Sequence, residues 1–189
     1  MFRTIGVAAL LLSVAGPALA HPDHDVSGFL HPFTGIDHLL AMVGGGVWAS
    51  LLATRKPVTA VLVPVAFVLM MAVGAGAGFS GIKLPLTEAV ILASVFVVGG
   101  LLVGAVRLST GAAMAIVGLF AVFHGYAHAL EAPAAETGGY ILGFLAGTSL
   151  LQLFGLGLGW VAQRTVGVAG FRALGGVVMA GGALVLITQ

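Results

Sequence analysis

Six long apolar runs divide this chain, and a lipid bilayer is the environment in which such runs are stable. Each is close to the roughly 20 residues that an α-helix needs to cross a membrane. Short polar or charged segments separate the runs. Their expected bounds are 28–53, 57–79, 86–106, 110–130, 138–162 and 168–187. The sequence therefore predicts an all-α integral membrane protein, a bundle of six transmembrane helices over residues 28–189.

Composition supports this class and excludes several others. Hydrophobic residues make up 60% of the 189 residues and charged residues only 7%, against about 25% in soluble domains. A formal net charge of +1 leaves no basic surface for nucleic acid. The absence of cysteine excludes disulfides, thiolate metal sites and cysteine nucleophiles. No glycine loop of the Walker type is present, so we expect no nucleotide either.

The N-terminal segment has the form of a secretory signal peptide. Met1-Phe2-Arg3 supplies a positive region, residues 5–14 an apolar core, and Ala18-Leu19-Ala20 a cleavage site. We expect cleavage of residues 1–20, which leaves residues 21–27 as a short periplasmic segment. The alternative is an uncleaved first helix. A cleaved signal places the mature N-terminus outside the cytoplasmic membrane of a bacterium.

Positive charges predict the same orientation independently. Cytoplasmic loops of membrane proteins carry an excess of lysine and arginine. If the chain starts outside, the first, third and fifth helices end in the cytoplasm. Lys83 then lies outside, and five positive residues lie inside: Arg55, Lys56, Arg107, Arg164 and Arg172. We therefore expect a multi-pass protein of the bacterial inner membrane.

The first polar cluster lies at the outer end of the first span. It is the run His31-Pro32-Phe33-Thr34-Gly35-Ile36-Asp37-His38. Ionisable groups inside a bilayer are costly, so such a cluster indicates a functional site. On one continuous helix, His31 and His38 would lie two turns apart and within about 20° of each other. Asp37 would point elsewhere, and would be a ligand only if the helix is distorted; otherwise it orients a histidine or accepts a proton.

The second cluster closes the fourth span, where His124, His128 and Glu131 follow at i, i+4 and i+7 on one helix face. The fourth helix runs opposite to the first, so the two clusters lie at similar depth on the external side. Single buried histidines usually serve helix packing, but four at one depth favour a metal site. The predicted site comprises His31, Asp37, His38, His124, His128 and Glu131. The histidines are the expected ligands, and the two carboxylates are either ligands or partners that fix a histidine tautomer.

Other residues carry weaker hypotheses. Glu88 opens the third span, as a charge favoured by the helix dipole or as a carboxylate that attracts incoming ions. Met42, one turn below His38, is an accessory candidate. His21 and His24 are candidates for metal capture, against the alternative of a solvated tail.

Three polar residues lie in the middle of the fifth span: Thr148, Ser149 and Gln152. Polar side chains at that depth commonly form hydrogen bonds between helices. We favour this interpretation over an inner path for ions.

Two motifs resemble the signatures of the HupE/UreJ family. The first is His31-Pro32…Gly35…Asp37-His38…Ala41-Met42 followed by Trp48, and the second is Phe123-His124-Gly125-Tyr126-Ala127-His128…Glu131. The resemblance covers the whole chain, including the signal peptide and the helix count. Ala129 stands where many members have glycine, which tightens the site slightly and leaves the ligands unchanged. Members are small membrane proteins linked to hydrogenase and urease maturation and regarded as secondary nickel or cobalt transporters.

The resemblance implies that Ni²⁺, or Co²⁺, passes from periplasm to cytoplasm as a substrate, with no prosthetic group and no enzymatic activity. The residues alone indicate a divalent metal site open to the outside, and Cu²⁺ or Zn²⁺ would suit the same donors. Two alternatives stay open: an intramembrane zinc-dependent lipid hydrolase of the ceramidase-like kind, and a metal-binding membrane sensor or accessory subunit. The expected partners are the metal ion and the bilayer, and a homo-oligomer is left open.

Overall fold

The computed structural model describes residues 27–133 and 137–188. The predicted signal peptide, most of the segment 21–27, and both His21 and His24 lie outside the described residues. Within the described ranges the chain is helical and has no strand. The elements are α2 (Ser27–Leu30), the short 3₁₀ helix η1 (His31–Phe33), α3 (Ile36–Ala53), α4 (Thr59–Phe79), α5 (Thr87–Val103), α6 (Thr110–Glu131), α7 (Thr137–Thr165) and α8 (Val168–Thr188).

Five of these helices are long and apolar enough to cross a membrane, namely α3, α4, α6, α7 and α8. The third expected span forms the shorter apolar helix α5, of 17 residues, at the lower limit for a crossing helix. Large apolar side chains cover the outward faces: Leu69, Leu142 and Ile187 are 62%, 71% and 79% exposed. Such faces are stable only against lipid, so the described chain is a membrane-embedded helical bundle.

The first expected span is not one continuous helix, and the prediction that His31 and His38 share a helix face is wrong. α2 and η1 form a separate turn before α3 begins. Pro32 in η1 has no N–H group to donate, and the Thr34 hydroxyl and N–H both bond back to the His31 carbonyl, at 2.8 and 3.0 Å. Gly35 is extended, with φ −85° and ψ 117°. Asp37 and His38 therefore lie in the first turn of α3, directly after this break.

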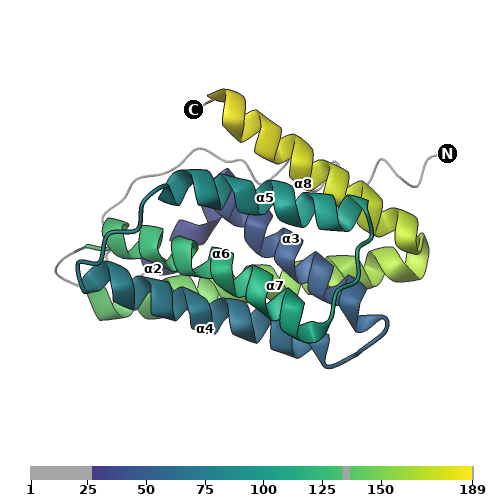
Figure 1. The fold of residues 1–189 in the computed structure, drawn as a ribbon, viewed down its shortest axis with the longest axis horizontal. Helices are drawn as coiled ribbons and strands as arrows, with labels where there is room; N and C mark the ends of the chain where they lie inside the picture. The colour runs from purple at the N-terminus through teal and green to yellow at the C-terminus, as the bar shows by residue number, and fades with distance from the viewer. Residues whose placement is uncertain (1–26, 134–136, 189) are drawn as a thin grey trace.

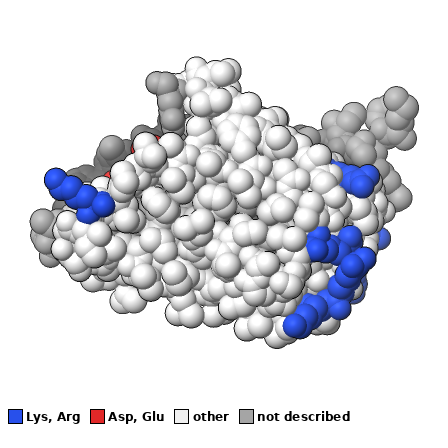
Figure 2. All heavy atoms as spheres, viewed as in Figure 1, with Lys and Arg blue, Asp and Glu red and all other residues white. Residues whose placement is uncertain are grey.

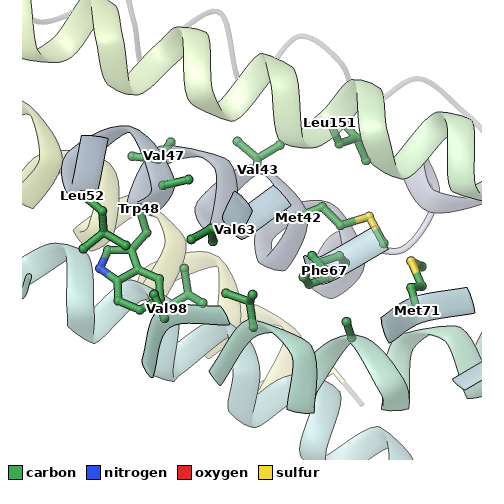
Figure 3. Close-up of a cluster of buried hydrophobic side chains, with 14 of the residues drawn as sticks. Met42, Val43, Val47, Trp48, Leu52, Val63, Phe67, Met71, Val98 and Leu151 are labelled. Carbon is green, nitrogen blue, oxygen red and sulfur yellow. The ribbon is translucent and has the colours of Figure 1, made fainter. Parts of the chain in front are cut away.

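α3 lies at the centre of the bundle, as Figure 1 shows, with α4, α5, α7 and α8 packed around it. α4 packs along α6, and α5 packs along α8. Close approach of α4 and α6 depends on Gly125, where an added Cβ would overlap the Met71 carbonyl of α4. The buried core between these helices includes Met42 and Trp48 of α3, which Figure 3 shows facing side chains of α4 and α5.

The two ends of the bundle differ in charge. The connections α3–α4, α5–α6 and α7–α8 lie at one end (Figure 1), and Figure 2 shows most lysine and arginine side chains gathered there. That end carries all five positive residues that the sequence assigns to one side of the membrane, whereas Lys83 belongs to the α4–α5 connection at the opposite end. The opposite end also holds η1, the start of α3 and the end of α6, so the two polar clusters meet there.

Candidate metal site

The structure brings the four histidines of the two clusters together in a single row. His31 comes from η1, His38 from the first turn of α3, and His124 and His128 from the last two turns of α6. The ring centroids are 4.9 Å apart for His31 and His128, 4.9 Å for His128 and His38, and 5.1 Å for His38 and His124. His128 is therefore the member that contacts imidazoles on both sides.

The row joins exposed and buried side chains. His31 and Glu131 form its outer end, with 30% and 53% of their side chains exposed. His128 and His124 are fully buried. His38 keeps 12% of its side chain exposed, so the two buried imidazoles lie next to ones that solvent reaches.

The outer group consists of His31, His128 and Glu131. One ligand atom from each lies within 4.8 Å of the other two, and His31 Nε2 is 2.6 Å from Glu131 Oε2. With metal–nitrogen bonds of about 2.1 Å, neighbouring ligand atoms in a coordination sphere stand about 3–4 Å apart. Small side-chain rotations would therefore close this group around an ion.

The inner pair, His38 and His124, has its tautomers set by hydrogen bonds. His38 Nδ1 lies 2.9 Å from Asp37 Oδ1, an oxygen that also accepts the His38 backbone N–H at 2.8 Å. His124 Nδ1 lies 2.9 Å from the carbonyl oxygen of Phe120. Because both oxygens only accept, each ring donates from Nδ1, and its lone pair is on Nε2. This is how proteins orient histidines that bind metal.

The other ring nitrogens of the buried histidines have no hydrogen-bond partner among the described residues. His38 Nε2, His124 Nε2 and both ring nitrogens of His128 are buried without a hydrogen bond. Buried polar atoms in proteins are nearly always satisfied, because an unpaired one costs its full desolvation penalty. Four unpaired nitrogens in one row therefore indicate that a ligand completes the site.

The mouth of the site is a cavity of about 260 Å³ lined by His31, Thr34, Gly35, Asp37, His38, Glu88 and Glu131. Three carboxylates in its walls favour a cation. Glu88 thus joins the site from α5, although its place in the first turn of that helix also suits a dipole interaction. Gly35 leaves room for the inner pair, since an added Cβ would lie 3.1 Å from both Asp37 Oδ1 and His38 Nδ1.

Three aromatic side chains line the site, and they were not predicted from the sequence. Phe144 of α7 stacks on His128, with centroids 4.9 Å apart and planes at 17°. Tyr140 lies 5.8 Å from His31, and Phe67 of α4 lies 5.8 Å from His124. The available signal was the spacing of Tyr140 and Phe144, four apart in the outer half of the fifth span. These rings pack against three of the four imidazoles.

Below the histidines, the polar residues of α7 differ from one another. Thr148 donates to Met71 Sδ of α4 at 3.5 Å, so its interhelical hydrogen bond is confirmed. Ser149 bonds within α7 instead, to the Leu145 carbonyl at 2.7 Å. The buried Gln152 Oε1 has no partner among the described residues.

Met42 is fully buried in the cluster with Met71. Figure 3 shows their sulfur atoms near Phe67. The accessory role of Met42 stays a prediction.

Comparison with known proteins gives one consistent result. The family model described as HupE / UreJ protein matches residues 9–185. A curated protein described as Protein HupE, from Rhizobium leguminosarum bv. viciae, is 38% identical over 188 residues, which cover 96% of this chain and 97% of that protein. No solved structure matches the chain.

Proposed function

The chain belongs to the HupE/UreJ family, and from that premise we propose that it is a secondary transporter carrying Ni²⁺, or Co²⁺, from periplasm to cytoplasm. The observation that carries the proposal is the row of four imidazoles, which leads from an acidic mouth into the bundle and ends in unpaired nitrogens. Imidazole and carboxylate donors without thiolate suit these ions. The family assignment also favours a transport or accessory role over an enzyme.

Capture takes place at the mouth. Glu88 and Glu131 attract the hydrated cation, and His31 and His128 replace part of its water shell together with Glu131. In this step the ion takes the place of the hydrogen bond between His31 Nε2 and Glu131 Oε2.

Transfer inward uses His128, because both of its ring nitrogens are unpaired and its ring is equally close to His31 and His38. The ion passes to Nε2 of His38 and of His124, which already carry their lone pairs. On this proposal Asp37 is the partner that orients His38, and Glu131 is a ligand.

Beyond the histidines, the proposed route follows one face of α7. Tyr140, Phe144, Thr148 and Gln152 repeat every four residues, and all four are buried. From Phe144 to Gln152 the helix rises about 12 Å. Gln152 faces Gly45 of α3, where an added Cβ would lie 3.3 Å from Gln152 Nε2. Thr148 is already hydrogen-bonded to Met71 Sδ, so we assign the next step of the route to Gln152, which has an unpaired oxygen and a glycine opposite.

The proposed orientation puts the histidine end in the periplasm and the basic end in the cytoplasm of the inner membrane. Six crossings are required, with α5 as the third. Because α5 has only 17 residues, it crosses with little tilt.

The test is uptake of Ni²⁺, Co²⁺, Cu²⁺ and Zn²⁺ into liposomes that contain the purified protein. We expect saturable Ni²⁺ or Co²⁺ flux that is lost in His38→Ala and retained in Lys83→Gln, whose side chain lies at the same end but outside the site. Tight binding without flux would overturn transport in favour of a sensor. Metal-dependent release of fatty acid from the liposomes would instead indicate a hydrolase.

A further inference from the structure

A second cavity lies at the basic end of the bundle, opposite the histidines. Its volume is about 360 Å³. Three cationic side chains, Arg55, Lys56 and Arg107, and three hydroxyl residues, Thr59, Ser109 and Thr110, line it. They come from the α3–α4 and α5–α6 connections, which the proposed metal route does not use.

The positive charges in this cavity are not neutralised within the described chain. No acidic residue lines the cavity, and the ion pairs among the described residues all lie at the histidine end. Arg107 Nε and Thr110 Oγ1 are buried without a hydrogen-bond partner there. A cavity lined by several hydrogen-bond donors and by no negatively charged side chain is suited to bind an anion.

The fold holds Arg107 in place at the cost of a strained backbone. Ala105, two residues earlier, has φ +49°, a conformation that side chains other than glycine rarely adopt. The buried Trp48 fixes the same segment, because its Nε1 donates to the Val106 carbonyl at 2.9 Å. Arg107 is thus directed by a connection that is anchored in the core.

The donors suit a phosphate group. A guanidinium can bind two phosphate oxygens at once, and Arg55 and Lys56 add charge. The cavity also lies at the N-terminal ends of α4 and α6, through Thr59 and Thr110, where the helix dipole favours negative charge. Leu52 and Leu108 complete the lining with apolar surface, which suits a lipid better than a free ion.

We infer that this cavity binds the phosphate of an acidic phospholipid from the leaflet at the basic end of the bundle. The general excess of positive charge on cytoplasmic loops accounts for the sign of these residues. That general excess does not explain why three positive side chains line one cavity that also contains unpaired hydrogen-bond donors. Arg172 is a contrast at the same end: it is exposed and does not line the cavity. The inference does not depend on transport.

The experiment measures lipid binding to the purified full-length protein by native mass spectrometry. Delipidated protein is titrated with phosphatidylglycerol or with phosphatidylcholine, and the same titrations are made with Arg107→Gln and Arg172→Gln. The two variants lose the same charge at the same end. We expect one phosphatidylglycerol to bind about tenfold more tightly than phosphatidylcholine, a loss of about tenfold in Arg107→Gln, and a change of less than twofold in Arg172→Gln.

Inorganic phosphate separates the two sources of the anion. If millimolar phosphate displaces phosphatidylglycerol, the ligand is a free phosphate and the lipid assignment is overturned. Equal binding of the two lipids, or an equal loss in Arg107→Gln and Arg172→Gln, also overturns it. Thermal unfolding of each variant checks the fold; if Arg107→Gln is unfolded, Arg55→Gln replaces it, with the same expected loss.

Discussion

Replacing Asp37 by asparagine tests whether this carboxylate orients His38 or binds the metal itself. One oxygen, Oδ1, accepts from the His38 backbone N–H and faces His38 Nδ1. Asparagine has the same shape, and its carbonyl oxygen can take both of these positions. The hydrogen bonds are then retained, but the acceptor has lost its charge.

The expected magnitude follows from that loss. A hydrogen bond to a charged group contributes about 1.5–3 kcal/mol and a neutral one about 0.5–1.5 kcal/mol. The difference of about 1–1.5 kcal/mol corresponds to roughly a tenfold weaker affinity for metal. This lies at the lower end of the range of about 10–100-fold found when the partner of a metal-binding histidine is changed.

The assay is calorimetric titration of Ni²⁺ into the purified protein in detergent. Glu88→Gln is the matched control, since it removes one negative charge from the same cavity and has no hydrogen bond to a histidine within the described residues. We expect Asp37→Asn to weaken binding about tenfold, Glu88→Gln to weaken it less, and His38→Ala to weaken it most.

Two outcomes would refute this reasoning. An affinity unchanged within about twofold would mean that the charge of Asp37 contributes nothing to metal binding. If Asp37→Asn lost as much Ni²⁺ affinity as His38→Ala, Asp37 would be a direct ligand. Exchanging a charged for a neutral hydrogen-bond acceptor could not explain so large a loss. Equal losses in Asp37→Asn and Glu88→Gln would reduce the role of Asp37 to attraction at the mouth.

Three further predictions concern other parts of the molecule. Gly35→Ala should weaken Ni²⁺ binding several-fold in the same titration. The new Cβ would lie 3.1 Å from both Asp37 Oδ1 and His38 Nδ1, so it must displace that pair. A variant with wild-type affinity would contradict this prediction. Gln152→Leu should leave Ni²⁺ affinity intact and abolish flux into liposomes, whereas normal flux would remove Gln152 from the route. Gly125→Ala should destabilise the bundle by about 1–3 kcal/mol, because the new Cβ overlaps a backbone carbonyl of α4. The midpoint of thermal unfolding should fall. In the control Gly111→Ala, the new Cβ meets no atom within 4 Å, and the midpoint should not fall.

Helix positions were predictable because each depends on a local property of the sequence. The expected bounds of the second to sixth spans lie within three residues of the helix ends found. The clusters were also predictable, because the reversal of direction from one span to the next sets the depth of each residue. The break at Thr34 and Gly35 was missed, because proline also suits the first turn of a helix and gave no sign of a second helix start.

Apolar length and alternating direction set the depth of each residue, so the membrane-embedded helical class and the meeting of the two histidine clusters at one end follow from the sequence. Which side chains are lateral neighbours depends on how the helices pack. Packing between segments remote in sequence places His128 between His31 and His38 and stacks Phe144 on His128. Such packing also brings Arg107 and Arg55 to one cavity. The hydrogen bonds at Nδ1 of His38 and His124 are local, because their partners Asp37 and Phe120 lie one and four residues away in the same helix. Packing decides instead that the remaining Nε2 atoms are buried without a partner among the described residues.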